Sequence, residues 1–311
     1  MESGTGDITV REPLVSVIVG TKDRPLLIMR AIRTILAQTY PNFECLIVDS
    51  GTSAETEALV KEIKDKRISY YKLLPDPGRV ESLNFGISKS KGEYITFLDD
   101  DDEYLPGKLE KQARALHDSD DIVGMAYCWS MFYDEGNEKK LYDLKNDIRG
   151  YVFTNALEYM AFCSFPALML KRKPLIETGL TDEANYPSDW LFVARFTKKY
   201  HVVDVPEVLV KANINHIYDR MSVPREKDKD YYTRIKNFHI HFYTLFKADY
   251  IKIPRKAMIH LYPIITVSAI LKNYREWFIY SAEAIRLGPL NLKTYQKIIK
   301  SSYHALIPFT R

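Results

Sequence analysis

Four consecutive aspartates, Asp99 to Asp102, constrain what this chain can fold into more than any other stretch. They follow residues 92–98, a run rich in aromatic and β-branched side chains that predicts a buried strand. Open α/β sheets bind their ligands at the carboxyl ends of strands. Four neighbouring negative charges repel one another, and a divalent cation would offset that repulsion. The run therefore predicts either a metal site at a strand end or a solvated acidic turn.

Upstream of the aspartates, patterns of buried strands alternate with helical patterns. Strands are expected at residues 14–19, 43–48, 68–73 and 94–98, and helices at residues 26–38, 56–64 and 82–89. Nearly continuous apolar strands with short connections are typical of a parallel, doubly wound sheet built from βαβ units. We therefore expect an α/β fold for this part of the chain.

The chain beyond the aspartates is mixed up to Ser222 and helical from Arg225. Helices are expected near residues 225–247, 257–272, 275–287 and 292–305. Residues 251–311 contain 10 Lys and Arg but 2 Asp and Glu, a net charge of +8, whereas the whole chain carries +3. A basic tail on a slightly acidic body predicts contact with an anionic surface such as phospholipid. A merely solvated basic face and a homodimer interface are the alternatives, and no nucleic-acid partner is expected.

Three cysteines, Cys45, Cys128 and Cys163, lie far apart within apolar runs. Their number and spacing fit neither a disulfide framework nor a zinc site, so we expect buried thiols in a reducing compartment. The first residues lack the pattern of a secretory signal. The longest weakly polar run, residues 257–271, is too short and too interrupted to span a bilayer. We expect a cytoplasmic protein. If the basic tail contacts phospholipid, the protein would lie peripherally on the inner face of the cell membrane.

Five segments in matching order give the chain a resemblance to the inverting glycosyltransferases of family 2. They are residues 15–25, 38–44, 47–52, 83–87 and 92–102, and the similarity continues to Ser222. The resemblance implies the GT-A fold, which is Rossmann-like, with a mostly parallel sheet and flanking helices. It implies a glycosyltransferase domain at residues 1–222, divided into a nucleotide-sugar-binding half at 1–105 and an acceptor-binding half at 106–222. The basic helical C-terminal region at residues 223–311 lies outside the resemblance.

In this family a nucleotide-diphosphate sugar lies across the ends of the first and fourth strands. The resemblance implies that Asp49 accepts hydrogen bonds from the base or ribose of the donor, with a structural turn as the alternative. Thr21, Asp23 and Arg24 would approach the nucleotide, although the family more often has Asn where this chain has Asp23. Arg79 would clamp the diphosphate, since a guanidinium suits phosphate oxygens, or would be a surface arginine.

The aspartate run contains the Asp-x-Asp pattern of the family as Asp99 and Asp101. Residues two apart on a strand face the same way, so these two side chains would share one side. Asp101 is assigned to Mn²⁺ or Mg²⁺, hard cations that bind oxygen ligands. Asp99 and Asp100 remain alternatives for the nucleotide contact, depending on the register. Asp102 is expected to help cap the helix that begins near Pro106.

Asp189 matches the position of the family's catalytic base. The family has an acidic pair before Trp190, and here Ser188 replaces the first acid. A carboxylate beside an acceptor hydroxyl can take its proton during attack. The alternative role for Asp189 is a helix N-cap. His216 matches a histidine that closes over the diphosphate or the metal in many relatives, and a structural histidine is the alternative.

The resemblance implies transfer of one sugar from a nucleotide-diphosphate sugar, expected to be a UDP-sugar, to a hydroxyl of a glycan or polyprenyl-linked acceptor. A processive synthase would carry Gln-x-x-Arg-Trp, and none of Gln38, Gln112 and Gln296 begins that motif. A nucleotidyltransferase would need a Gly-rich basic loop after the first strand, which residues 20–24 do not supply. A binding module that kept the fold and lost turnover is the non-enzymatic alternative.

Overall fold

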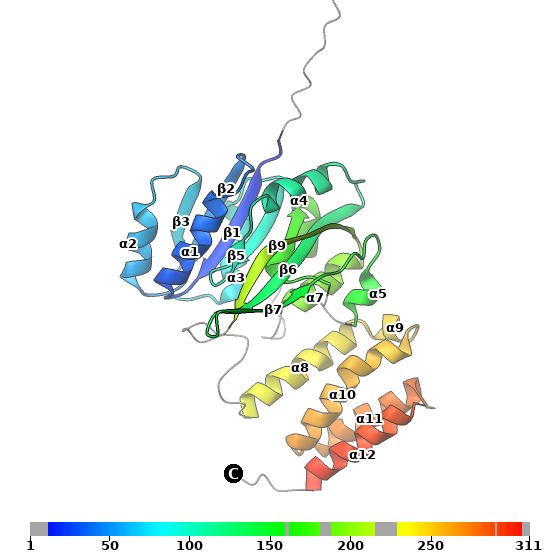
Figure 1. Ribbon diagram of the computed structural model, residues 1–311. Coiled ribbons are helices and arrows are strands. Elements are labelled where there is room, and N and C mark those ends of the chain that lie inside the picture. Colours follow the sequence, from blue (N-terminus) through cyan, green and yellow to red (C-terminus); the bar gives the residue numbers. More distant parts are fainter. Residues whose placement is uncertain (1–11, 159–161, 181–187, 215–228, 290, 307–311) are drawn as a thin grey trace, which may run out of the picture. The chain divides into compact units, whose positions relative to one another are not determined.

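The structure is a computed structural model that describes residues 12–158, 162–180, 188–214, 229–289 and 291–306. The chain divides into two compact units, one containing the sheet and the other built from helices (Figure 1). Within the described residues, no helix combines the length and the apolar character needed to cross a bilayer. The three cysteines are buried, as the sequence predicts.

The first unit is organised around one mixed sheet. Its strands are β1 (Val15–Thr21), β2 (Phe43–Asp49), β3 (Ile68–Lys72), β4 (Tyr94–Asp99), β5 (Glu103–Tyr104), β6 (Val123–Asp134), β7 (Lys139–Leu144), β8 (Leu168–Lys171) and β9 (His201–Ile214). Their spatial order is β3-β2-β1-β4-β8-β6-β9-β5, and β7 pairs with β6. The predicted parallel half is confirmed in β3, β2, β1 and β4, whereas β8 runs antiparallel to both β4 and β6.

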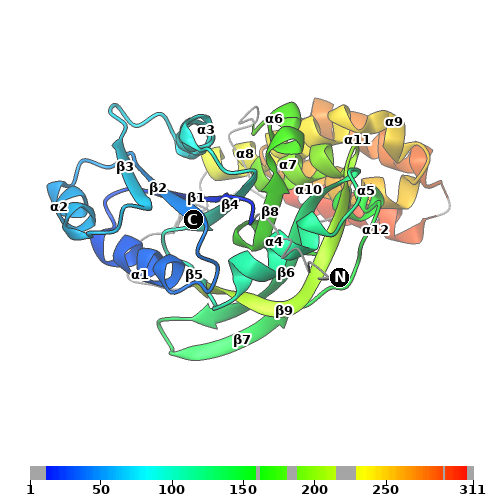
Figure 2. The ribbon, with the colours of Figure 1, turned by 90° about the horizontal axis from the view of Figure 1, so that it is seen from above.

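Helices flank this sheet on both faces. They are α1 (Pro25–Leu36), α2 (Ala54–Glu62), α3 (Arg79–Lys89), α4 (Lys108–His117) and α6 (Arg172–Thr178). Figure 2 shows α3 on one face and α1 on the other. The chain moves from β1 outward to β2 through α1 and crosses back from β3 to β4 through α3, and right-handed connections in opposite directions place these helices on opposite faces. This arrangement brings the carboxyl ends of β1, β2 and β4 to one edge of the sheet.

Two prolines affect the strands of this sheet. Phe165–Ala167 forms a 3₁₀ turn and β8 begins only at Leu168, since Pro166 has no N–H for a sheet ladder. β9 continues past Pro206, because the register with β6 shifts there and leaves the proline out of the pairing.

The second unit is helical. It contains α5 (Phe153–Ala156), α7 (Ser188–Thr197), α8 (Lys229–Leu245), α9 (Lys247–Tyr250), α10 (Pro254–Ile270), α11 (Tyr274–Leu287) and α12 (Leu292–Leu306). α10 is central, since α8, α11 and α12 all pack against it. The predicted domain boundary at residue 222 lies outside the described residues and stays a prediction. The grouping of α5 and α7 with the C-terminal helices is not evident from the sequence.

An aromatic cluster joins α7 to the C-terminal helices within this unit. The Trp190 indole donates to the Ala156 carbonyl at 2.6 Å, and its ring lies 4.9 Å from the rings of Phe242 and His260. The Nδ1 atoms of His239 and His260 are 2.9 Å apart. Burial lowers the pKa of His260 to about 3, so the ring is neutral and packs like an aromatic side chain.

A lysine lies in the core of the first unit. Lys108 is fully buried at the start of α4. Its Nζ donates to Thr96 Oγ1 at 3.0 Å and lies 4.0 Å from the centroid of the Tyr104 ring. Burial lowers the pKa of Lys108 to about 7, because no carboxylate compensates the charged form.

This buried amine makes stability depend on pH in a defined direction. Between pH 7 and 10.5 the unfolded chain binds the Lys108 proton more strongly than the folded chain, so stability should rise with pH. We expect the free energy of unfolding of the wild type, relative to Lys108→Met, to rise by up to about 1.4 kcal/mol per pH unit between pH 7 and 9. Urea unfolding at several pH values measures this difference. The same comparison with Lys64→Met, an exposed lysine, should give no pH dependence. A constant difference for Lys108→Met would contradict the prediction.

Candidate active site

The ends of three parallel strands bring most of the predicted site residues to one edge of the sheet. Thr21, the last residue of β1, is in register with Asp49 of β2, and Gly20 is in register with Asp99 of β4. Buried apolar strands hold these ends in place. The position of Thr21, Asp49 and Asp99 therefore follows from strand pairing.

Asp100 is held by two residues from the end of β1. Thr21 Oγ1 donates to Asp100 Oδ2 at 2.7 Å, and Arg24 Nη1 donates to Oδ1 at 3.0 Å. The Asp100 side chain is 6% exposed. Burial raises the pKa of Asp100 to about 6, against the opposing effects of Arg24 and Thr21. Of the four aspartates, Asp100 thus joins the β4 end to the β1 loop.

Asp99 forms an ion pair with a different arginine. The Arg79 guanidinium, at the first residue of α3, lies 3.1 Å from Asp99 Oδ1. It also lies over the Phe165 ring, at 5.1 Å from the centroid. Asp99 is the more accessible carboxylate, with 39% of its side chain exposed. Arg79 begins α3 next to the end of β4, and its role as a diphosphate clamp stays a prediction.

Asp101 is positioned through its backbone. Arg30 Nη2 and Asn213 Nδ2 both donate to the Asp101 carbonyl, each at 2.9 Å. The side chain is 14% exposed and lies 3.6 Å from Arg24. α1 and β9 therefore fix the turn that presents the Asp101 carboxylate.

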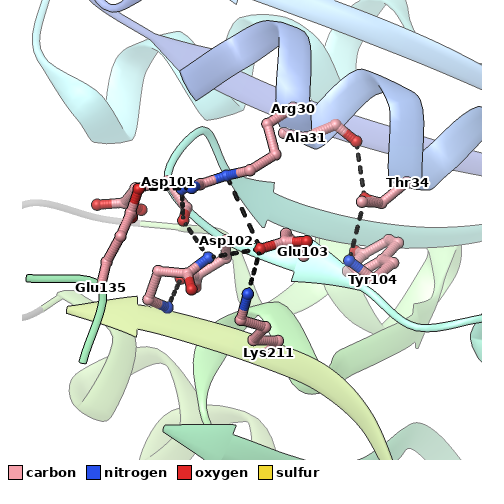
Figure 3. A network of polar contacts seen from close by, with 10 residues as sticks. Arg30, Ala31, Thr34, Asp101, Asp102, Glu103, Tyr104, Glu135 and Lys211 are labelled. Carbon is pink, nitrogen blue, oxygen red and sulfur yellow. Dashed lines mark hydrogen bonds and ion pairs between the residues drawn. The ribbon is translucent and has the colours of Figure 1, made fainter. Parts of the chain in front are cut away.

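A network of charges surrounds this turn (Figure 3). Glu103 Oε1 accepts from Lys211 Nζ at 2.9 Å and from Asn213 Nδ2 at 3.0 Å. Arg30 also donates to Glu135 at 2.8 Å. Burial would raise the pKa of Glu103, but the bonds from Lys211 and Asn213 and the nearby positive charges outweigh it, so the pKa is lowered. Glu103 is consequently ionised and part of the scaffold.

Asp102 belongs to the same scaffold and does not cap a helix. Its Oδ1 accepts from the Asn213 backbone N–H at 2.9 Å. The N-cap of α4 is Gly107, which has no side chain to donate or accept. The expected capping role of Asp102 is wrong because the side chain turns towards β9.

Asp49 and Asp23 are both occupied by protein donors. The buried Asp49 carboxylate accepts from the Gly51 N–H at 2.7 Å, from Tyr70 at 2.6 Å and from Lys72 at 2.9 Å. Asp23 has a φ of 52°. These contacts fit the structural-turn alternative for Asp49, and its nucleotide role stays a prediction.

The loops after β1 and β2 interlock through Asp23. Its Oδ1 accepts from the backbone N–H groups of Thr52 and Ser53, each at 2.7 Å. A Cβ on Gly51 would lie 2.5 Å from the Asp23 backbone nitrogen. Only glycine fits there, so the two loops form one rigid surface beside the strand ends.

Asp189 lies in the first turn of α7, in the helical unit, and is partly buried. Trp190 beside it is anchored in the aromatic cluster described above. Both roles expected for Asp189, the base and the N-cap, stay predictions. His216 lies outside the described residues. The structure thus brings Thr21, Arg24, Arg79 and the first three aspartates of the run together. Asp49 at the end of β2 and Asp23 on the loop after β1 lie beside them.

The donor set suits a hard divalent cation that shares its shell with a substrate. Within the described residues, no group of three or more His, Cys, Asp and Glu side chains could hold a metal by itself. Mg²⁺ commonly binds one or two carboxylates together with substrate phosphates. Asp99 and Asp101 supply such carboxylates, and Arg24 and Arg79 supply positive charge for phosphate oxygens. The residues present therefore fit a metal that is completed by the donor.

Arg30, Glu103, Lys211 and Asn213 were not anticipated as parts of this site. Arg30 was assigned to the polar face of the first helix, and an isolated Asn or Lys on an extended segment carries no motif. One usable signal was the Glu directly after four aspartates, because a fifth adjacent carboxylate needs a cation from elsewhere in the chain.

Comparisons with known proteins identify the family and the fold of the chain. The family model described as glycosyl transferase family 2 matches residues 16–179. A protein of Methanocaldococcus jannaschii named as an uncharacterized glycosyltransferase is 31% identical over 234 residues, which cover 71% of this chain and 78% of the relative. Another, from Rickettsia typhi, is 29% identical over 212 residues. This second match covers 65% of this chain and 64% of the relative, slightly less than two thirds of its length.

Two solved structures share the fold. Staphylococcus aureus TarS 1–349, in complex with UDP-GlcNAc, superposes with a TM-score of 0.68 at 15% identity, covering 94% of this chain and 88% of that one. The mannosyltransferase PcManGT of Pyrobaculum calidifontis, in complex with GDP-Man and Mn²⁺, gives a TM-score of 0.56 at 18% identity, covering 96% and 82%. At these identities the likeness shows the fold. The expected fold is confirmed: the chain belongs to glycosyltransferase family 2 and has the GT-A fold.

Proposed function

We propose that this protein is a metal-dependent, inverting glycosyltransferase that moves one sugar from a nucleotide-diphosphate sugar to a hydroxyl of a glycan or lipid-linked acceptor. The observation that carries the proposal is the meeting of carboxylates and guanidinium groups at the ends of β1 and β4. There Asp99, Asp100 and Asp101 lie beside Arg24 and Arg79. Family membership supports a nucleotide-sugar donor, and two neighbours of similar fold were solved with UDP-GlcNAc and with GDP-Man and Mn²⁺.

Each group at the strand ends has a distinct part in this mechanism. Arg79 and Arg24 bind the diphosphate of the donor, and Thr21, Asp23, Asp49 and either Asp99 or Asp100 bind its nucleoside. Asp101 would hold the cation, assisted by His216. When bound, Mn²⁺ or Mg²⁺ supplies positive charge that stabilises the departing nucleoside diphosphate.

Asp189 acts as the general base. It takes the proton of the acceptor hydroxyl as that oxygen forms a bond to the anomeric carbon. The bond from the anomeric carbon to the phosphate oxygen breaks, and its electron pair leaves with the nucleoside diphosphate. Attack opposite the leaving group inverts the configuration. We further propose that the acceptor is presented at a membrane, on which the basic C-terminal helices dock peripherally.

Replacing the proposed base should separate chemistry from donor binding. We expect Asp189→Asn to lower kcat by about 10²–10⁴-fold while donor affinity stays unchanged, because the amide cannot accept the proton. Single-turnover release of nucleoside diphosphate, with donor affinity from calorimetry, measures both quantities. Metal-dependent turnover that survives this change would remove Asp189 from the role of base. Absence of turnover in the wild type with every nucleotide sugar tested would favour a binding module instead.

Replacing the proposed metal ligand should abolish the metal response. We expect Asp101→Asn to lower turnover about 100-fold or more and to leave the residual rate insensitive to Mn²⁺. Turnover of the wild type and the variant, measured against Mn²⁺ concentration and with EDTA, tests this. Asp143→Asn changes an ion-paired carboxylate on β7, outside the site, whose side chain is 13% exposed against 14% for Asp101, and serves as the matched control. An unchanged Mn²⁺ response in Asp101→Asn would contradict the assignment.

Asn213 is a positioning residue in this proposal, since it acts on Asp101 through the backbone carbonyl. We expect Asn213→Ala to weaken Mn²⁺ binding, in the presence of nucleoside diphosphate, by about 10–100-fold, as for other groups that orient a metal ligand. Electron paramagnetic resonance of free Mn²⁺ measures this without relying on activity. Lys211→Met removes a charge from the same network but touches Glu103 and not Asp101, so its effect should be smaller. Equal effects of the two variants would mean that Asn213 supports the fold only.

A further inference from the structure

Six large apolar side chains are exposed on α11 and α12. They are Tyr274, Phe278, Ile279, Leu292, Tyr295 and Ile299, and Phe278 and Leu292 are 68% and 76% exposed. Residues three or four apart share one side of a helix. The first two therefore project together from α11, and Leu292, Tyr295 and Ile299 project together from α12. We call this set, with the basic residues among it, the α11–α12 face.

α11 and α12 are held next to each other by shared packing and by a hydrogen bond. Both pack against α10, and the Trp277 indole of α11 donates to Ser301 Oγ of α12 at 3.0 Å. Among the side chains that the structure describes on α11 and α12, the buried ones are small, such as Ala284 and Ser301, whereas the six large apolar ones above are exposed. Such a cluster of exposed large apolar side chains is typical of a surface that binds a partner.

The charge of the face has one sign. Arg275, Lys293 and Lys300 are exposed, and no acidic residue is exposed between positions 274 and 300 in the part that the structure describes. The two acids of α11 are bound by other side chains of the protein. Glu276 accepts from Lys236 at 2.6 Å, and Glu283 accepts from Tyr243 at 2.7 Å and pairs with Arg286 at 2.8 Å, so Arg286 is already neutralised. Arg275, Lys293 and Lys300 leave the outward side basic.

We propose that the α11–α12 face docks on an anionic lipid bilayer. Aromatic and aliphatic side chains would enter the boundary between head groups and acyl chains, and the basic side chains would contact the anionic head groups. This deepens the membrane association proposed above by naming the surface, and it rests on that part of the proposed function. Sugar transfer itself does not enter the argument.

Charge decides between a bilayer and a second copy of the chain. Two such faces in a symmetric dimer would bring basic residues together without acidic partners, which opposes association. An anionic bilayer supplies the missing charge and accepts apolar side chains at the same time. The face therefore fits a lipid surface better than it fits itself.

Vesicle co-sedimentation tests the proposal with the full chain. We expect binding to vesicles of phosphatidylcholine and phosphatidylglycerol, little binding to phosphatidylcholine alone, and loss of binding as salt screens the charges. Removing two positive charges in Lys293→Gln/Lys300→Gln should weaken binding about tenfold or more, since each contributes roughly 1 kcal/mol near such a surface. Phe278→Ser/Leu292→Ser should weaken it as well.

Matched controls keep this result specific. Lys64→Gln/Lys66→Gln removes two exposed lysines outside the face, and Ile176→Ser removes an apolar side chain that is 59% exposed. Both controls should bind as the wild type does.

Equal binding to neutral and anionic vesicles, no binding, or binding that the face variants leave unchanged would overturn the proposal. A dimer in analytical ultracentrifugation that Phe278→Ser/Leu292→Ser dissociates would identify a second copy as the occupant. Donor hydrolysis without vesicles, measured on the same variants, should be unaffected and reports separately on the transferase assignment.

Discussion

The interaction on which the site depends is the neutralisation of adjacent carboxylates by cations from distant segments. Four aspartates and a glutamate in sequence would repel one another, and none of them could be buried without compensation. Arg24 from the β1 loop, Arg79 from α3, Arg30 from α1 and Lys211 from β9 supply that compensation. Each reaches the same turn because the sheet brings its element there. The acidic run is thus compensated only because the fold brings four separate elements to one turn.

The division of labour within the run follows from this compensation. Asp100 and Asp102 are buried and bind protein groups, Thr21 and Arg24 in one case and the β9 backbone in the other. Asp99 and Asp101 are the more exposed pair. β4 ends at Asp99, and the turn that follows it buries Asp100 and Asp102 and leaves Asp101 more exposed. The Asp-x-Asp spacing therefore corresponds to the two more exposed aspartates, Asp99 and Asp101. The two buried ones, Asp100 and Asp102, attach the turn to the rest of the sheet.

The strand ends could be predicted from the sequence because apolar periodicity and strand order are local patterns. Thr21, Asp49 and Asp99 were located in this way, and the structure confirms that they lie at strand ends. The contacts of Arg30 and Asn213 with the Asp101 carbonyl could not be predicted, because they join residues 71 and 112 positions apart and involve a backbone atom. Likewise, the saturation of Asp49 by Tyr70 and Lys72 depends on which side chains of β3 turn towards β2. Long-range geometry of this kind leaves no motif in one sequence.

The anchoring of Trp190 among α8 and α10 has a consequence for the transfer of parts of this chain to another protein. α7 lies within the stretch that resembles the family, yet the Trp190 ring packs against C-terminal helices that the resemblance does not cover. A chimera that joined the residues up to α7 to the C-terminal helices of a relative would leave the Trp190 ring facing foreign side chains. Such a graft would have to carry α7 with the C-terminal helices or include compensating changes around the indole. In its packing, the helical unit is therefore larger than the stretch of sequence that looks appended.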